Sequence, residues 1–340
     1  MLRIAIDVMG GEHGPAVTVP AAAGVLARDP GFELLLTGDG DEIRRHLDRL
    51  PPALSQRCRI RHAGAVFADT ERPERILRHG RDSSMYRAVE AVAEKEADAC
   101  VSAGNTGALL LVSRHLLDML PGVDKPALVA ALPVFSGRRR TLLLDVGATL
   151  ECSGEQLYQF GIMGAVLLSS LETRSRPRVG LLNIGTEEYK GHRQIHEAAR
   201  LFDRAVDTLE YTGFVEANRV FAGDADVLVC DGFSGNVTIK ASAGAVQAID
   251  RMIGDVTGRH PVRAALSGPL FREIRDQADP AQYNGASLLG LTGIVVKSHG
   301  HSDVDGFAYA VSHAVREASQ QVPRIIAREI GRVISQSTRE

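Results

Sequence analysis

Short apolar runs alternate with longer helical patterns along the chain, and this alternation limits the possible folds more than any other feature of the sequence. The predicted strands are residues 3–7, 33–37, 58–62, 99–102, 128–134, 141–145, 178–183, 227–230 and 293–298. The predicted helices are residues 16–28, 41–50, 83–96, 106–119, 154–170, 192–207, 235–253, 262–276, 304–318 and 322–334. Repeated strand–helix–strand units are typical of a mostly parallel sheet that helices cover on both faces. The sequence therefore predicts an α/β protein.

The segment 128–145 is predicted to differ from the other units. Its two apolar runs flank Ser136-Gly137-Arg138-Arg139-Arg140, whose composition is typical of a hairpin turn, so we expect one antiparallel pair in the sheet. No internal repeat, low-complexity tract or disordered linker interrupts the 340 residues. We therefore expect a single catalytic α/β domain over residues 1–340, with a peripheral helical segment at about 246–276.

Charge and cysteine content narrow the class of protein. The net charge of −3 provides no basic field, so nucleic acid is not expected as a partner. The four cysteines form no CxxC pair, which favours a reducing compartment over a secreted disulfide framework. The first residues have the pattern of a strand and not of a signal peptide, and no apolar run approaches the roughly 18 residues that span a bilayer. These features predict a cytoplasmic location.

Glycine-rich and polar motifs follow the predicted strands, at the carboxyl ends where open α/β sheets bind ligands. The first strand ends in Asp7, and Gly10, Gly11 and His13 follow it. Glycines at these positions let the backbone approach a ligand closely. The dinucleotide-binding pattern GxGxxG is absent from this loop. Turn formation and helix capping remain the alternative role for Asp7 and His13.

A second motif is a candidate phosphate site. The strand at 99–102 leads into Ser102-Ala103-Gly104-Asn105-Thr106-Gly107. A small polar turn that opens a helix presents free N–H groups and the positive end of the helix dipole, and both attract anions. The side chains of Ser102, Asn105 and Thr106 could add donors to the N–H groups near Gly104. The alternative is a plain capped helix.

A third loop carries a lysine among glycines. Asn183, Gly185, Glu187 and Lys190 follow the strand at 178–183, and Lys190 is one of only five lysines among 39 basic residues. Lys190 could bind phosphate while Glu187 orients it. The alternative is an exposed ion pair, which contributes about 0–1 kcal/mol to stability.

A fourth motif opens the next predicted helix. Asp231, Ser234, Gly235 and Asn236 follow the strand at 227–230. Such a helix start is a second candidate site for an anion or for a carbonyl oxygen.

The last predicted strand ends with a lysine and a histidine. Lys297 and His299 occupy alternate positions, so both can face the same side of the strand. His299, His301 and Asp303 have only weak metal-ligand spacing, and we expect neither a metal nor another cofactor.

Taken together, the motifs resemble one known family. The blocks that carry the resemblance are Ile6-Asp7-Val8-Met9-Gly10-Gly11, His13-Gly14-Pro15, Ser102-Ala103-Gly104-Asn105-Thr106-Gly107-Ala108, Asn183-Ile184-Gly185-Thr186-Glu187-Glu188, Lys190-Gly191, Asp231-Gly232-Phe233-Ser234-Gly235-Asn236, Gly285-Ala286, Leu288-Leu289-Gly290 and Lys297-Ser298-His299-Gly300. They fall in order and span nearly the whole chain. The chain resembles the bacterial phosphate acyltransferases of the PlsX family.

The sequence departs from the family pattern at a few positions. Thr149 and Glu151 stand where the pattern has Asn and Asp, and Glu12 stands where it has Asp. Asn284 and Ser287 replace the usual Gly and Pro. Thr149 keeps a hydroxyl and the two glutamates keep their charge, so these departures bear on fine geometry and acyl-chain preference more than on the reaction.

The resemblance implies a fold and a reaction. The implied fold is a three-layer α/β/α sandwich, similar to phosphotransacetylases and isocitrate-type dehydrogenases, in a homodimer. The implied reaction is the transfer of a fatty acyl group from acyl carrier protein to inorganic phosphate, early in phospholipid synthesis and without a cofactor. A membrane glycerol-3-phosphate acyltransferase would consume the acyl phosphate, so peripheral membrane contact is also expected. No covalent enzyme intermediate is expected, because phosphate is itself an anionic nucleophile.

We assign catalytic roles on this basis. Phosphate is expected at the helix start at Gly104–Thr106, with Lys190 or Lys297, and the oxyanion at N–H groups near Gly235 and Asn236. His299 could protonate the departing thiolate.

Two surfaces are expected to serve the substrate. The apolar positions of 246–274 are candidates for an acyl groove, and a basic amphipathic helix there also suits membrane contact. For most of these residues the core or a dimer interface is favoured over membrane contact. Acyl carrier protein is acidic, so a basic docking patch is expected. Its candidates, both also typical of solvated faces, are arginines 138–140 and Arg72, Arg75, Arg78 and Arg81.

Three other functions remain open from the sequence. One is a phosphotransacetylase that uses coenzyme A and short acyl groups, which acyl-chain preference would distinguish. Another is a nicotinamide-dependent decarboxylating dehydrogenase, because that fold class does not require GxGxxG. The last is a non-catalytic scaffold, which would leave the polar strand-end loops unexplained.

Overall fold

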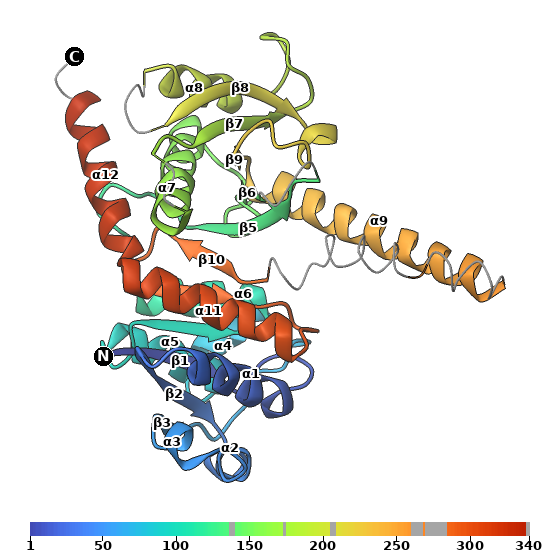
Figure 1. Ribbon diagram of the computed structural model, residues 1–340. Coiled ribbons are helices and arrows are strands. Elements are labelled where there is room, and N and C mark those ends of the chain that lie inside the picture. Colours follow the sequence, from blue (N-terminus) through green and yellow to red (C-terminus); the bar gives the residue numbers. More distant parts are fainter. Residues whose placement is uncertain (136–139, 173–174, 205–208, 260–267, 269–283, 338–340) are drawn as a thin grey trace.

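One mixed sheet runs through the protein (Figure 1). The computed structural model describes all residues except 136–139, 173–174, 205–208, 260–267, 269–283 and 338–340. The strands within the described residues are β1 (Leu2–Asp7), β2 (Phe32–Gly38), β3 (Cys58–His62), β4 (Ala99–Ser102), β5 (Ala127–Pro133), β6 (Arg140–Leu144), β7 (Arg178–Asn183), β8 (Glu210–Glu216), β9 (Val227–Val229), β10 (Ala286–Leu289) and β11 (Ile294–Lys297). Their order in the sheet is β3-β2-β1-β4-β11-β10-β5-β6-β9-β7-β8.

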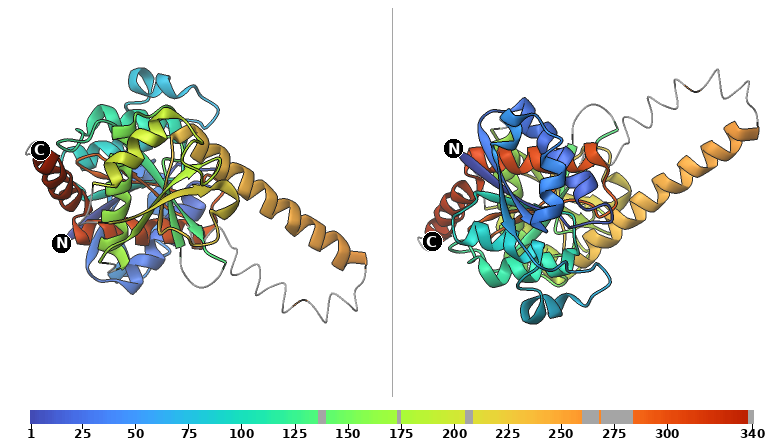
Figure 2. Two further views of the ribbon diagram at one scale, coloured as in Figure 1. Left: turned by 90° about the horizontal axis from the view of Figure 1, so that it is seen from above. Right: turned by 90° about the horizontal axis from the view of Figure 1, so that it is seen from below.

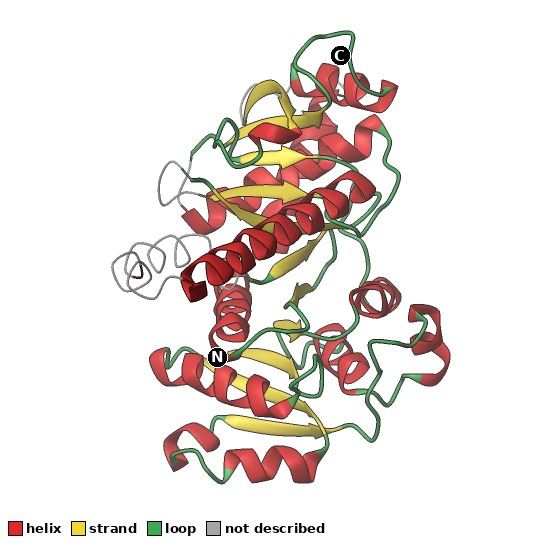
Figure 3. Cartoon of the chain, turned by 90° about the vertical axis from the view of Figure 1, so that its right-hand side faces the viewer, coloured by secondary structure: helices red, strands yellow, loops and turns green. Residues whose placement is uncertain are grey.

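Helices cover both sides of this sheet, as Figure 3 shows from the side. They are α1 (Pro15–Arg28), α2 (Gly40–Leu47), α3 (Pro52–Ser55), α4 (Ile76–His79), α5 (Ser84–Ala93), α6 (Thr106–Leu116), α7 (Gly154–Glu172), α8 (Arg193–Phe202), α9 (Gly232–Arg259), α11 (Val304–Gln320) and α12 (Val322–Ser337), with short 3-10 turns at Pro73–Arg75 and Ala217–Arg219. The prediction of helices is confirmed, with ends that shift by a few residues. The helix predicted at 262–276 lies outside the described residues.

Alternate residues of one strand belong to opposite layers. On β1, Ile4 and Ile6 are buried in the cluster that includes α1 and α11, whereas Ala5 is buried in the cluster that includes α5 and α6. Side chains alternate between the two faces of a strand, so the sheet is buried on both faces. The predicted three-layer α/β/α sandwich is confirmed.

The predicted antiparallel pair is confirmed. β5 pairs antiparallel with β6 from Val129–Leu144 to Pro133–Arg140. Of the turn predicted at 136–140, residues 136–139 lie outside the described residues, and Arg140 begins β6. The sequence did not predict β10, which is antiparallel to both β5 and β11. It also missed β8, an edge strand whose residues are mostly part-buried or exposed.

α9 projects from the body of the protein (Figures 1 and 2). It starts at Gly232, three residues before the predicted start, because Asp231 caps it, and it continues to Arg259. Ile249, Met252 and Val256 on α9 are 57%, 67% and 60% exposed. Within the described residues, no helix has both the length and the apolarity needed to cross a membrane.

Candidate active site at the carboxyl ends of the strands

Asp7 and Ser102 end the neighbouring strands β1 and β4, and their side chains meet. The buried Ser102 hydroxyl donates to Oδ2 of Asp7 (2.6 Å) and accepts the backbone N–H of Gly104 (3.1 Å). A Cβ atom at Gly10 would lie 2.5 Å from the same Asp7 oxygen. This close packing explains the glycine, and it gives Ser102 the role of holding the turn at Gly104.

The start of α6 keeps free backbone donors. Asn105 caps the helix, because its Oδ1 accepts the N–H of Ala108 (3.0 Å), and its Nδ2 donates to the carbonyl of Asp69 (2.9 Å). The N–H groups of Thr106 and Gly107 donate to no other described residue. Free N–H groups at a helix N-terminus bind anions, so the geometry suits the predicted phosphate site.

Lys297 ends β11 beside this helix start. β11 pairs with β4, which places Lys297 opposite Ser102. The ammonium donates to the carbonyl of Ala103 (3.2 Å) and to that of Ser298. Burial lowers the pKa of Lys297 from 10.5 to about 8, although the carboxylates of Asp69 and Asp7 act in the opposite direction. Lys297 is therefore a desolvated cation beside a helix N-terminus.

Asp7 is buried close to this lysine. Burial raises the pKa of the Asp7 carboxyl, and its hydrogen bonds with Ser102 and Ser84 lower it in part. Its Oδ1 atom is buried and has no hydrogen-bond partner. Asp7 therefore retains one unused buried oxygen near the Lys297 ammonium.

The loop after Lys297 is held to the loop after β1. Glu12 and His301 form a contact of 2.8 Å between Oε2 and Nδ1, and the N–H of Glu12 donates to the carbonyl of Gly300 (3.0 Å). Gly11 has a φ of 81°, and a Cβ there would lie 2.9 Å from that carbonyl. His13 is exposed and forms no side-chain hydrogen bond with a described residue.

His299 is a neutral donor in this arrangement. Burial lowers its pKa, and the neighbouring Lys297 and His301 lower it further. Its Nδ1 accepts the backbone N–H of His301 (3.3 Å), so the ring proton belongs on Nε2. Within the described chain, no group of three His, Cys, Asp or Glu side chains converges as a metal site.

Asn284 fixes the backbone of His299, a role that the sequence did not reveal. Its Oδ1 accepts the N–H of His299 (3.0 Å), while its Nδ2 donates to the hydroxyls of Ser298 (2.8 Å) and Ser302 (2.9 Å) and to the carbonyl of Gly306 (2.8 Å). The departure from glycine at this position is the only feature of the sequence that pointed to it. Asn284 is a positioning residue for the loop that carries Lys297 and His299.

We expect Asn284→Ala to lower kcat about tenfold while the KM for phosphate changes little. The reason is that small displacements of a positioned group can reduce rates by up to about 100-fold. Asn284→Asp keeps the acceptor for His299 and should retain more activity than alanine. Steady-state kinetics with Asn218→Ala, an exposed asparagine, as the control would check this. Equal kcat values for Asn284→Ala and wild type would remove the positioning role.

A second part of the site forms around Asp145 at the end of β6. Its fully buried carboxylate accepts the backbone N–H groups of Leu128 (2.8 Å), Gly147 (3.0 Å), Ala148 (3.0 Å) and Thr149. Burial raises the pKa of this carboxyl, and the four N–H groups lower it in part. Asp145 therefore shapes the loop at 146–149. The sequence analysis gave it no role, although an aspartate at a strand end before glycine is a usable pattern.

α9 starts directly on that loop. Asp231 accepts the N–H and the hydroxyl of Ser234 (2.8 and 2.9 Å), and its carbonyl accepts the N–H of Gly235 (3.0 Å). A Cβ at Gly235 would lie 1.9 Å from the carbonyl oxygen of Asp145. The N–H of Gly235 is thus already used, whereas the side-chain amide of Asn236 makes no hydrogen bond with a described residue. That amide lies beside Gly147.

The Lys190 loop folds on itself at the end of β7. The Lys190 ammonium contacts Oε1 of Glu187 (2.8 Å), and this hydrogen bond lowers the pKa of Glu187. Asn183 donates to the carbonyl of Lys190 (2.9 Å), and a Cβ at Gly185 would collide with the Lys190 side chain at 2.3 Å. Among the described residues, the Lys190 ammonium contacts neither Lys297 nor Asn236.

A small cavity joins the first two parts of the site. Thr106 and Lys297 line one side of it, and Gly147 and Ala148 line another. The structure therefore brings together the ends of β1, β4 and β11 with the loop on which Asn236 lies. Lys297 and the start of α6 form an anion-binding site on one side, and the Asn236 amide is a donor on the other. This arrangement suits a reaction between an anion and a carbonyl group.

Comparisons with known proteins agree with this geometry. Residues 2–325 match the family model described as "Fatty acid synthesis protein". The phosphate acyltransferase of Halorhodospira halophila is 45% identical over 336 residues, which cover 98% of this chain and 97% of that protein.

Solved structures share the fold. A phosphotransacetylase from Streptococcus pyogenes covers 94% of both chains with a TM-score of 0.62 at 16% identity, and the EutD phosphotransacetylase of Staphylococcus aureus covers 93% of this chain and 94% of its own with a TM-score of 0.59 at 14% identity. At such identities the likeness concerns the fold alone. The family match rests on the sequence: the chain belongs to the phosphate acyltransferases of the fatty acid synthesis protein family, and it is an enzyme of acyl transfer involving phosphate.

Proposed function

We propose that this enzyme transfers a fatty acyl group from acyl carrier protein to inorganic phosphate and so supplies acyl phosphate for phospholipid biosynthesis. The observation that carries the proposal is the position of Lys297, a part-buried ammonium beside the free N–H groups at the start of α6. Phosphate at neutral pH carries the charge that this site would neutralise, and it needs no activation by a base.

The reaction would proceed without a covalent enzyme intermediate. A phosphate oxygen attacks the thioester carbonyl carbon and forms a new C–O bond, and the carbonyl oxygen takes the negative charge. The C–S bond then breaks, and the carrier thiolate leaves and takes a proton from water. Holding the two reactants in line can lower the barrier by up to about 7–11 kcal/mol.

We assign the oxyanion to Asn236 and to the Nε2–H of His299. The amide of Asn236 forms no hydrogen bond with a described side chain and faces the loop at Gly147. One such donor contributes about 2.7–4 kcal/mol to stabilisation of the transition state. The lowered pKa of His299 favours donation from the neutral ring over proton transfer to the thiolate, which leaves readily without help.

We place the docking of the acidic carrier protein on the segment that follows Asp69. The Asp69 carbonyl is bonded to Asn105, the cap of α6, and a Cβ at Gly107 would touch Pro73. The segment therefore lies against the phosphate end of the site. Its four exposed arginines are Arg72, Arg75, Arg78 and Arg81. Of the other candidates for docking, Arg138 and Arg139 lie outside the described residues, and Arg140 is part-buried and ion-paired with Glu172.

We also propose that α9 mediates contacts beyond the single chain. The exposed side chains of Ile249, Met252 and Val256 form an apolar stretch, which a second copy in a homodimer or a membrane surface would cover. This contact would serve delivery of acyl phosphate to a membrane glycerol-3-phosphate acyltransferase. The apolar positions predicted at 262–274 lie outside the described residues.

Incubation of the pure protein with palmitoyl-acyl carrier protein, with and without phosphate, tests the reaction. Acyl phosphate would be trapped as the hydroxamate. Product that depends on phosphate, and not on nicotinamide or metal, supports the proposal. Product from acetyl-coenzyme A but not from the carrier thioester would favour a phosphotransacetylase. No product from either thioester with the folded protein would remove the proposal.

Phosphate affinity is expected to fall as the pH rises above about 8, where the Lys297 ammonium loses its proton. The pH profile of kcat/KM reports pKa values of the free enzyme, so kcat/KM for phosphate should decline about tenfold per pH unit there. Lys297→Arg should remove this decline, because arginine stays charged. A wild-type profile that is flat between pH 7 and pH 10 would contradict the role of Lys297.

A further inference from the structure

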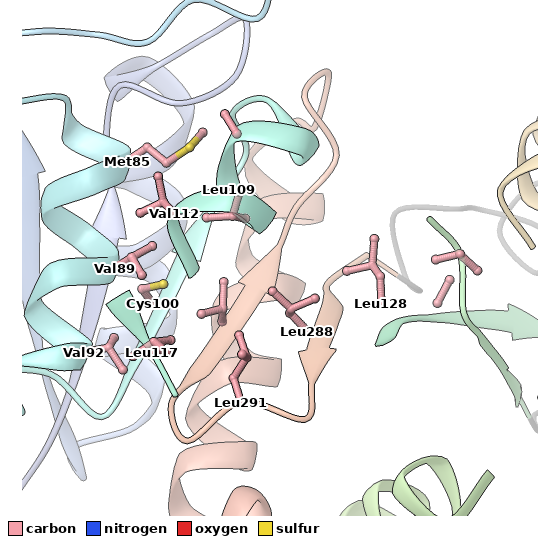
Figure 4. Packing of buried hydrophobic residues seen from close by; sticks show 14 of the residues in the cluster. Met85, Val89, Val92, Cys100, Leu109, Val112, Leu117, Leu128, Leu288 and Leu291 are labelled. Carbon is pink, nitrogen blue, oxygen red and sulfur yellow. The ribbon is translucent and has the colours of Figure 1, made fainter. Parts of the chain in front are cut away.

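The cavity between the two parts of the site has an apolar interior. Leu109 and Leu110 from α6, Leu128 from β5, Leu288 from β10 and Val295 from β11 line it, below the first turn of α6. Figure 4 shows Leu109, Leu288 and Leu128 on three successive elements of the same hydrophobic cluster. Each of the three is less than 10% exposed. The interior therefore offers contacts to hydrocarbon and not to water.

The polar groups of the cavity lie together with the catalytic groups. Thr106 begins α6 and Lys297 ends β11, whereas Ala148 belongs to the loop that Asp145 holds. A carbonyl carbon placed between the phosphate site and Asn236 thus lies at the mouth of this cavity. The acyl chain attached to that carbon can then extend along the apolar side chains that line the cavity beside α6.

We propose that this cavity binds the part of the acyl chain next to the reacting carbonyl and selects the acyl group there. This inference rests on the proposed reaction and deepens it. The cavity is much smaller than the ligand pockets of about 300–1,000 Å³ that hold whole small molecules. The cavity therefore holds the proximal methylenes of a straight chain and not a whole long chain.

The apolar stretch of α9 lies too far away for this task. Ile249 is thirteen residues beyond Asn236, which is about 20 Å along a helix axis. The carbons next to the carbonyl cannot reach it, whereas Leu110 and Leu128 line the same cavity as Lys297. Each methylene buried in the cavity should favour binding about fourfold.

The test is to fill the cavity from α6. Leu110→Phe should lower kcat/KM for octanoyl and palmitoyl thioesters about 10- to 100-fold, and for acetyl thioester less than threefold, with phosphate as acceptor. Leu111→Phe is the matched control, because Leu111 is its part-buried neighbour on the same helix and does not line the cavity. The control should leave all three values near wild type.

Two further variants keep the test decisive. Ala148→Leu fills the cavity from the opposite wall and leaves its backbone N–H bond to Asp145 in place, so it should repeat the pattern if Leu110→Phe fails to fold. Leu110→Ala should raise kcat/KM for a 2-methyl-branched acyl thioester relative to the straight chain.

The outcomes separate the two proposals. The acyl site would be overturned if the wild type is active but the filled variants lose activity equally with acetyl and palmitoyl thioesters. It would also be overturned if neither filled variant loses activity. Both results leave the reaction in place. No acyl phosphate from any thioester with wild type would remove the reaction itself.

Discussion

Lys297→Met is expected to lower phosphate-dependent formation of acyl phosphate about 100- to 1,000-fold. The variant removes the charge that faces the free N–H groups of α6, and one preorganised charge or donor in such a site has an effect of that size. The measurement is kcat/KM for phosphate with palmitoyl-acyl carrier protein. Lys95→Met, at an exposed lysine, is the control and should behave as wild type. Activity of Lys297→Met near that of Lys95→Met would remove Lys297 from the mechanism.

The same variant is expected to be more stable than the wild type. The pKa of Lys297 lies at about 8 in the folded protein, below its ordinary value of 10.5, so the charged form is disfavoured by folding. Between pH 8 and pH 10.5 the unfolded chain therefore binds more protons than the folded protein. The cost of burying the charged Lys297 is fully present below pH 8 and disappears as the pH rises towards 10.5. The shift corresponds to about 3 kcal/mol, and loss of the bonds to the Ala103 and Ser298 carbonyls offsets part of it. Urea unfolding should show a gain of about 1–2 kcal/mol at pH 7.

Asp145→Ala is expected to destabilise the protein by about 4 kcal/mol or more. The change leaves four backbone N–H groups without their acceptor, and each unpaired buried donor costs about 1–3 kcal/mol. Removing the buried carboxylate also relieves its desolvation, which raises its pKa in the wild type. We expect the four lost bonds to outweigh this relief, because they hold the whole loop at 146–149.

Two variants bracket the effect of Asp145. Asp145→Asn keeps one oxygen and should cost less than alanine, since its amide can still accept from one side of the loop. Asp118→Ala, at an exposed aspartate, should unfold at the wild-type urea midpoint. An Asp145→Ala protein with that same midpoint would show that the loop at 146–149 is held by other contacts.

The sequence predicted the class of fold because the patterns that distinguish strands from helices are local. Strand and helix periodicity can be read from short windows, and the burial of alternate residues on β1 matches that reading. It did not predict β10, because Ala286–Leu289 becomes a strand through pairing with two neighbours that lie elsewhere in the chain.

The two candidate phosphate-binding lysines also show the difference between what the sequence predicts and what the structure decides. Lys190 and Lys297 both have glycine and histidine close by in the sequence, and composition alone gives no preference between them. In the structure the Lys190 ammonium contacts Glu187 within its own loop, whereas burial lowers the pKa of Lys297 beside the start of α6. Desolvation depends on everything that surrounds a group, so no local pattern can report it.

By itself, the sequence determined the α/β class, the strand-end loops that carry the polar residues and the family to which the chain belongs. Only the tertiary structure decided which of these loops meet. It placed the helix start at Thr106, Lys297 and the Gly147–Ala148 loop around one cavity, and it turned Asp145 and Asn284 into supports for that arrangement. The physical reason is that backbone conformation follows from neighbours along the chain, whereas the order of strands in a sheet and the burial of charge follow from neighbours in space.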